Sequence, residues 1–143
     1  MDPQAAWDLV MDWDRQSRWM VLTRVWATGN DGVGVGGGVA ARTSVGPLGF
    51  TDDMVITHWD PPRECTVKHL GTVVRGTGTF AIVAGRRGVD DTGAQSGVCT
   101  FTWSEDVVPP LGRLGLAAWP VVRTALEVMM RVSLRGLLRE ASR

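Results

Sequence analysis

The feature of the sequence that most constrains its fold is a long helical pattern at the C-terminal end. After Pro109-Pro110, apolar residues recur at helical spacing along one broad side, and charged residues recur every fourth position along the other. A helix with so broad an apolar side needs a second apolar surface to pack against. Because proline removes a helical hydrogen bond, we expect Pro120 to bend or restart this helix, with a short helix before it and a helix of roughly 22 residues after it.

The segment between residues 21 and 108 predicts the surface that receives this helix. Runs of β-branched and aromatic residues alternate there with Gly, Pro, Asn and Asp at a spacing of roughly 10–15 residues, which is typical of an antiparallel meander. A twisted sheet of this kind offers one face to a helix. The predicted strands are residues 21–28, 39–45, 50–59, 64–70, 72–84 and 98–108, and a polar glycine-rich loop is predicted at 86–97.

The N-terminal residues predict helices before the sheet. Asp2 is suited to cap a helix, and Pro3 suits the first helical position. A second short helical segment is predicted at residues 14–19. Because a chain of 143 residues has the length of one ordinary domain, we predict a single α+β domain over residues 1–143.

Composition excludes several classes of function. The formal net charge is zero, whereas a general nucleic-acid-binding domain usually carries a basic excess. Cys65 and Cys99 are too few for a disulfide scaffold and lack metal-ligand spacing, so we expect reduced, buried thiols. No apolar run approaches the roughly 18–20 residues that span a bilayer, and residues 1–3 lack the features of a signal peptide. We therefore expect a cytoplasmic protein without a nucleic-acid partner or integral membrane association.

A curved sheet wrapped around one helix predicts a cavity between them. Side chains need not fill that space, and cavities of this kind bind apolar ligands. The chain has seven Trp and six Met, and Met suits a wall that adapts to its ligand. The inward-facing positions predicted to line this ligand site are Trp19, Met54, Ile56, Val67, His69, Phe80, Phe101, Trp103, Trp119, Val122, Leu126 and Met130.

Strand alternation identifies the residues best placed for acid–base chemistry. In residues 64–70, His69 lies on the face opposite Lys68, so we expect the imidazole to point inward. Glu105 shares a face with Trp103, and a carboxylate against an apolar wall is suited to act as an acid or a base. The interpretation that we favour is that Glu105 is solvated at its strand end or paired with an arginine, for which Arg75 is the natural candidate.

Three further patterns favour structural roles. Residues 32–37 match G-x-G-x-x-G, but a strand follows where a dinucleotide site needs a helix, so we interpret them as a turn. His58 shares a face with Met54 unless a bulge shifts the register. Asp52-Asp53 has no further ligand at metal spacing, so we interpret this pair as a solvated strand edge and expect no metal.

Several segments together, in their order and spacing, resemble a known family. They are residues 6–9 (AWDL), Asp14, residues 18–20 (RWM), 46–50 (GPLGF), 59–63 (WDPPR), 74–78 (VRGTG) and 101–105 (FTWSE), and the final helix. The chain resembles the SRPBCC (START-related) superfamily in its bacterial polyketide cyclase/dehydrase-like branch. The resemblance implies a helix-grip fold, in which a curved antiparallel sheet grips a long C-terminal helix over an apolar cavity.

One difference from the family affects the sheet. Members usually have seven strands, of which the first precedes the first helix, whereas this sequence predicts six strands and starts at the helix. The strand at 98–108 then lacks a neighbour and presents an open edge. We therefore expect a homodimer formed through this edge, addition of a strand from elsewhere, or poor solubility.

The sequence favours one function and keeps an enzymatic alternative. The first hypothesis is binding of a small hydrophobic ligand, such as a lipid, a polyketide or an isoprenoid-like molecule, in the cavity without a cofactor. The family resemblance implies the alternative, an aromatase-type polyketide cyclase/dehydrase that positions its substrate in the same cavity. The candidate catalytic residues for that alternative are His69, Glu105 and Arg75.

Overall fold

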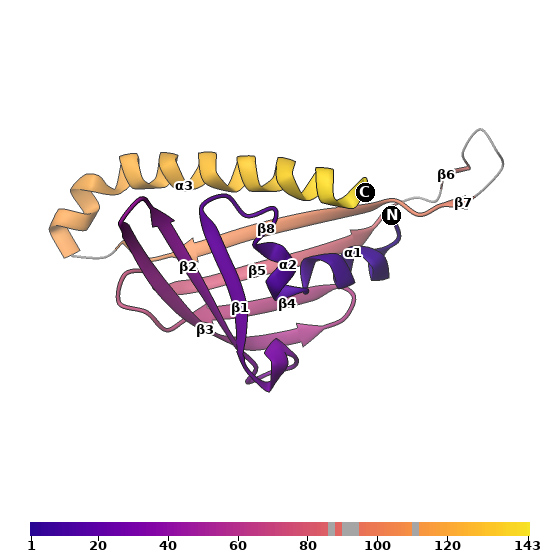
Figure 1. Cartoon of the computed structure of the whole chain (residues 1–143), viewed down its shortest axis with the longest axis horizontal. Coiled ribbons are helices and arrows are strands. Elements are labelled where there is room, and N and C mark those ends of the chain that lie inside the picture. The colour runs from indigo at the N-terminus through magenta and orange to yellow at the C-terminus, as the bar shows by residue number, and fades with distance from the viewer. Residues whose placement is uncertain (86–87, 90–94, 110–111) are drawn as a thin grey trace.

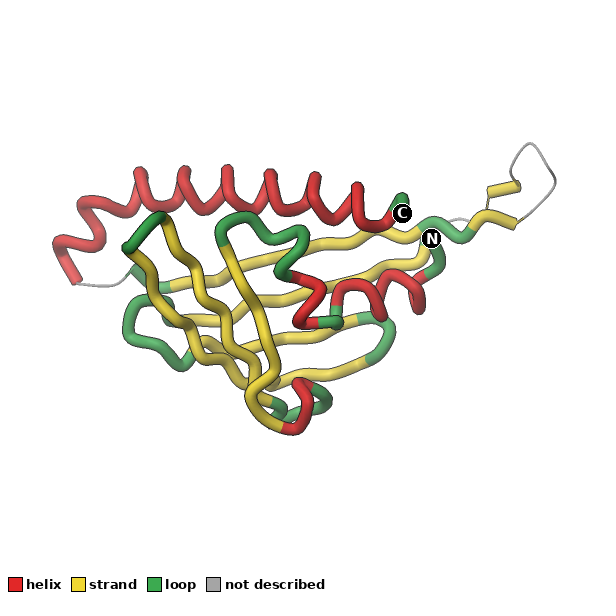
Figure 2. The backbone as a smooth tube through the Cα atoms, in the orientation of Figure 1, coloured by secondary structure: helices red, strands yellow, loops and turns green. Residues whose placement is uncertain are grey.

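The computed structural model describes residues 1–85, 88–89, 95–109 and 112–143, which form an α+β fold (Figures 1 and 2). Two short helices come first, a series of strands follows, and one long helix ends the chain. In order they are α1 (Pro3–Val10), α2 (Trp13–Gln16), β1 (Thr23–Gly29), the 3-10 helix η1 (Asn30–Gly32), β2 (Gly38–Val45), β3 (Leu48–Asp60), β4 (Glu64–His69), β5 (Gly76–Ala84), β6 (Gly88–Val89), β7 (Gln95–Ser96), β8 (Cys99–Val107) and α3 (Gly112–Ala141).

In the described part of the chain, the main sheet has six antiparallel strands in the order β1-β2-β3-β4-β5-β8, which confirms the predicted number. Among the described residues, the short strands β6 and β7 pair with each other and with no other strand. They belong to the segment predicted as a glycine-rich loop, and residues 86–87 and 90–94 of that prediction lie outside the described residues. Pro110, predicted to help stop the last strand, lies outside them as well.

The long helix α3 lies along one side of the curved sheet (Figure 1). The helix α2 packs beside β1, while α1 packs against β5 and β8. Asp2 caps α1 as predicted, because its side chain accepts hydrogen bonds from the backbone of Gln4 and Ala5. This arrangement of sheet and helix confirms the predicted helix-grip fold.

Pro120 bends the helix, which is one of the two predicted outcomes, whereas the predicted division into two helices is wrong. α3 is continuous from Gly112 to Ala141 with Pro120 inside it. Figure 1 shows its first turns at an angle to the rest of the helix. A proline removes one hydrogen bond and bends a helix, but the turns on either side can continue. The Thr124 hydroxyl donates a 2.8 Å hydrogen bond to the carbonyl of Pro120, within this continuous helix.

Two irregularities shift the predicted strands. β5 begins at Gly76 rather than at residue 72, and Gly76 has a φ of 131°, which favours glycine. A bulge between Ile56 and His58 changes the register of β3 against β4. Because of this bulge, His58 is exposed while Met54 and Ile56 face inward.

The glycine-rich segment after β1 is a turn, as predicted. Gly32, Gly34 and Gly36 all have positive φ angles, and the strand β2 follows them instead of a helix. A nucleotide-binding loop of the G-x-G-x-x-G type needs a helix at that point. The motif therefore serves to connect two strands.

The core lies between the helices and the inner face of the sheet. Trp7 of α1 packs edge-on against Trp59 of β3, with ring centroids 5.0 Å apart. Both cysteines are free, and Cys65 is fully buried. Burial, helped by the nearby negative charge of Glu64, raises the pKa of the Cys65 thiol to about 12. Cys65 is therefore a small apolar core residue, whereas Cys99 is only partly buried.

Candidate functional site

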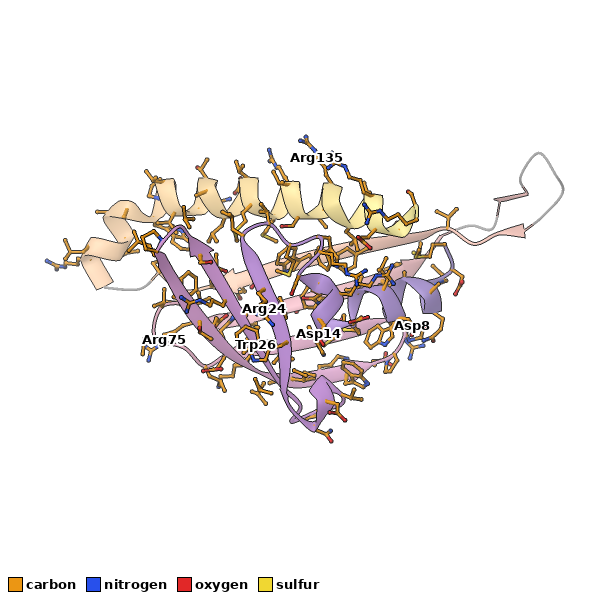
Figure 3. The ribbon with its side chains drawn as sticks, in the orientation of Figure 1. Asp8, Asp14, Arg24, Trp26, Arg75 and Arg135 are labelled. Atoms are coloured by element: carbon orange, nitrogen blue, oxygen red, sulfur yellow. The ribbon has the colours of Figure 1, made fainter. Side chains whose placement is uncertain are left out.

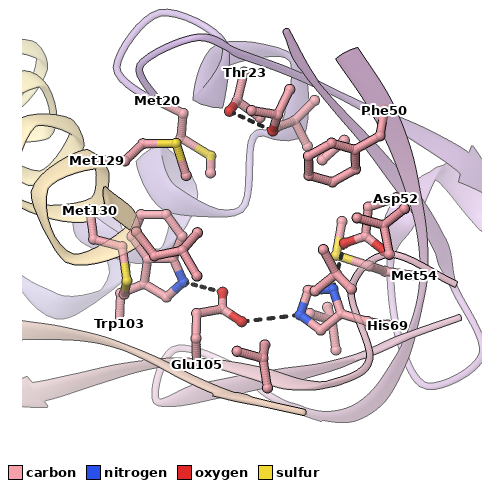
Figure 4. Close-up of a pocket in the computed structure, with 18 of the residues that line it drawn as sticks. Met20, Thr23, Phe50, Asp52, Met54, His69, Trp103, Glu105, Met129 and Met130 are labelled. Carbon is pink, nitrogen blue, oxygen red and sulfur yellow. Dashed lines mark hydrogen bonds and ion pairs between the residues drawn. The ribbon is translucent and has the colours of Figure 1, made fainter. Parts of the chain in front are cut away.

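A cavity of about 280 Å³ lies between α3 and the inner face of the sheet (Figure 4). Its wall is mainly apolar, with a few polar side chains. The described residues that line it are Trp13, Gln16, Met20, Thr23, Val25, Ala41, Thr43, Phe50, Asp52, Met54, Val67, His69, Val73, Val74, Phe80, Trp103, Glu105, Val107, Val108, Trp119, Val122, Leu126, Met129 and Met130.

Most residues predicted for the ligand site line this cavity. They come from the strands β3, β4, β5 and β8 and from the helix α3. Those that line it are Met54, Val67, His69, Phe80, Trp103, Trp119, Val122, Leu126 and Met130.

Trp19, Ile56 and Phe101 are not among the described residues of the cavity wall. Trp19 and Ile56 are buried in the core, and Trp19 packs edge-on against Trp103. Phe101 stacks on Phe80 at the part of the sheet that α1 covers. These three face inward as predicted, but Trp19 and Ile56 lie in the packed core, and Phe101 lines a second cavity beside α1 and the C-terminal part of α3.

Several lining residues were not predicted. Met20 and Met129 extend the methionine wall, and Thr23 pairs its hydroxyl with that of Thr43 at 3.0 Å. Helical spacing gave a signal for Met129, which is adjacent to the predicted Met130. The loop position of Met20 left no periodic signal.

The polar part of the wall is a cluster of Asp52, His69 and Glu105 (Figure 4). Asp52 lies on β3 and His69 at the end of β4, and these strands are neighbours. The Nδ1 atom of His69 is 2.5 Å from Oδ2 of Asp52, and its Nε2 atom is 3.0 Å from Oε2 of Glu105. The indole N–H of Trp103 donates to Oε1 of Glu105 over 2.7 Å. Both carboxylates are thus held in place by hydrogen bonds.

Glu105 reaches His69 across a strand that carries a glycine there. Glu105 is on β8, and β5 separates β8 from β4. Gly78 of β5 pairs with Glu105 on one side and with Val67 on the other. A Cβ atom on Gly78 would come within 2.9 Å of Oε1 of Glu105. The missing side chain therefore gives the carboxylate its path to His69.

The cluster holds His69 in its protonated form. Burial by itself lowers the pKa of His69, but the hydrogen bonds to Asp52 and Glu105 and the charges of both carboxylates outweigh it. The result is a pKa raised from 6.5 to about 9. An imidazolium donates from both ring nitrogens, which matches two carboxylates that only accept.

This geometry limits the chemistry available to His69. Both ring nitrogens are occupied, so the ring has no free lone pair with which to act as a base or bind a metal. Within the described part of the chain, no group of three His, Cys, Asp or Glu has the arrangement of a metal site. Glu105, with 22% of its side chain exposed, is the more accessible carboxylate of the cluster, since Asp52 has only 8% exposed.

Two interpretations of the sequence need correction. The prediction of a solvated edge at Asp52 is wrong, because Asp52 is buried against His69. The prediction that Glu105 is solvated or paired with Arg75 is also wrong, because Glu105 pairs with His69. Arg75 is exposed just before β5 and points away from the cavity (Figure 3).

A comparison with protein families gives one match. The model described as polyketide cyclase / dehydrase and lipid transport matches residues 1–142, which is almost the whole chain. The chain belongs to this family. The match confirms the resemblance to the SRPBCC superfamily that the sequence motifs indicate. The family suggests either cyclase/dehydrase activity or the binding of a lipid-like ligand.

Curated proteins give no match to the chain. No helix in the described part of the structure is both long and apolar enough to cross a bilayer.

Proposed function

We propose that the chain binds one small hydrophobic molecule, such as a lipid, a polyketide or an isoprenoid-like compound, in the cavity between α3 and the sheet. The single observation that carries the proposal is the cavity of about 280 Å³ with its mainly apolar wall. Moving apolar surface out of water gains about 25 cal/mol per Å², so such a wall favours an apolar guest. The family description, which includes lipid transport, supports the same function.

The wall combines adaptable and fixed parts. Met20, Met54, Met129 and Met130 line the cavity from a loop, the sheet and α3. Methionine side chains are unbranched and flexible, so they adjust to guests of different shape. The cluster around His69 is rigid by comparison, because four hydrogen-bonding groups hold one another. We infer that the apolar wall supplies affinity and that the cluster orients the guest.

Titration with N-phenyl-1-naphthylamine, a neutral apolar fluorescent probe, tests the proposal. We expect the probe to bind at one site per chain with enhanced fluorescence. The variant Ala41→Phe adds a ring inside the cavity and should abolish this binding, because Ala41 lines the wall. The matched control Ala117→Phe places the same ring on the exposed side of α3 and should bind normally. Equal binding by all three proteins, or by none of them, would refute the proposal.

A second candidate function is a polyketide cyclase/dehydrase reaction in the same cavity. The observation that favours it is the partly exposed carboxylate of Glu105, held by His69 and Trp103 against an apolar wall. A carboxylate so positioned is suited to accept a proton from a bound poly-β-ketone, while the protonated His69 balances its charge. In this reading Glu105 is the base and His69 positions it.

Product analysis with a synthetic poly-β-ketone thioester tests this candidate. We expect wild-type protein to accelerate the formation of an aromatic product, and Glu105→Gln to remove the acceleration while N-phenyl-1-naphthylamine still binds. The control Glu127→Gln changes an exposed carboxylate on α3 and should keep full activity. No acceleration by wild-type protein, or full acceleration by Glu105→Gln, would reject Glu105 as the base.

A further inference from the structure

The charges on the cavity wall are unbalanced. Asp52, Glu105 and His69 are the titratable residues in the described wall, and that wall has no Lys or Arg. Two carboxylates and one imidazolium leave a net charge of −1 beside an apolar space. An uncompensated charge away from water is costly, and a guest of opposite charge relieves that cost.

The hydrogen-bonding capacity of the cluster points in the same direction. Each carboxylate oxygen has two lone pairs, and the donors of the cluster occupy only one at each bonded oxygen. Oδ1 of Asp52 is buried and accepts no hydrogen bond in the described structure. Glu105 is the carboxylate that a guest reaches, since more of its side chain is exposed to the cavity. The cluster therefore has acceptors in excess.

We propose that the guest carries a cationic nitrogen at one end of its apolar body and that Glu105 binds this ammonium group. The proposal rests on the binding function proposed above and specifies its ligand class. A fatty acid or another carboxylate of the same size is a poor guest, because its charge repels Asp52 and Glu105 and meets no lysine or arginine on the wall. An alcohol of the same size is intermediate, because it donates a hydrogen bond without a charge.

Competition among three guests of equal chain length tests this selectivity. Octylamine, 1-octanol and octanoate are each titrated at pH 7 against wild-type protein carrying N-phenyl-1-naphthylamine. We expect octylamine to displace the probe at a concentration about tenfold lower than 1-octanol, as expected for a hydrogen bond between charged groups. Octanoate should be the weakest competitor.

The variant Glu105→Gln assigns the selectivity to its residue. It keeps the size of the side chain and removes the charge, so octylamine and 1-octanol should then compete about equally. The control Glu127→Gln, on the exposed side of α3, should keep the wild-type order. Octanoate or 1-octanol competing as well as octylamine against wild-type protein would overturn the proposal, and so would an unchanged order in Glu105→Gln. Failure of the probe itself to bind would instead refute the binding function.

Discussion

Raising the pH should destabilise this protein through a single buried histidine. The pKa of His69 is about 9 in the folded protein, against 6.5 for an ordinary histidine. A pKa that is raised on folding means that the folded state holds the proton more tightly than the unfolded state. The resulting stabilisation is fully present below about pH 6.5 and is lost as the pH rises through 9. Each pKa unit corresponds to about 1.4 kcal/mol, so the loss is about 3 kcal/mol.

Solvent screening reduces this figure little, because only 7% of the His69 side chain is exposed. Urea denaturation of wild-type protein and His69→Gln at several values between pH 6 and pH 9 measures the effect. We expect the free energy of unfolding of wild-type protein to fall by about 3 kcal/mol more than that of the variant. The contribution of Cys65, which is present in both proteins, cancels in the difference.

A direct titration makes the test independent of the stability of the variant. The ring signals of His69 in wild-type protein, followed by NMR, should titrate with a midpoint near 9. A midpoint near 6.5 would refute the account of the cluster. Parallel pH dependence of unfolding in wild-type protein and a folded His69→Gln variant would refute it as well.

Three other predictions concern Gly78, Ser133 and the edge strand β8. Gly78→Ala should push Glu105 away from His69, because the new Cβ would lie 2.9 Å from Oε1 of Glu105. An NMR titration should then show a lower pKa of His69, while the free energy of unfolding should change by only about 1 kcal/mol. Ser133→Ala should lower the free energy of unfolding, measured in urea, by about 1–3 kcal/mol, because it leaves the backbone N–H of Val21 without its 3.0 Å acceptor. The exposed control Ser142→Ala should change the free energy of unfolding little. The strand β8 is at the edge of the main sheet and pairs only with β5 among the described strands, so we predict a homodimer through that edge. Size-exclusion chromatography that gives a monomer at every concentration would contradict this prediction.

Strand alternation was sufficient to predict much of the cavity wall. Val67 and His69 face inward because they alternate with the solvated Lys68, and Trp103 and Glu105 face inward by the same rule. The same rule places Asp52 on the inner face of β3, because Asp52 and Met54 are two residues apart and so share a face. The prediction for Asp52 failed because Asp52 and Asp53 were interpreted together as a solvated strand edge, although only Asp53 lies on the outer face.

Other parts of the site depend on contacts that no local pattern contains. Ile56 faces inward but is buried in the packed core, and Phe101 faces inward but lines a second cavity beside α1. Arg75 was predicted to lie within the strand, but β5 begins at Gly76, so Arg75 is in the preceding loop and is exposed. The pairing of His69 with Glu105 needed the order of the strands and the absence of a side chain at Gly78. These are properties of the assembled sheet, so the residues alone did not predict them.

The central claim is that the guest sits in the cavity between α3 and the sheet, and the methionine methyl groups report on it directly. Met20, Met54, Met129 and Met130 line the cavity, whereas Met11 is in the core outside its described wall. NMR spectra of protein with labelled methionine methyl groups are recorded during titration with N-phenyl-1-naphthylamine. The account predicts that the signals of the four cavity methionines shift together and saturate at one equivalent while Met11 stays unchanged. Saturable binding that leaves those four signals unmoved would contradict it.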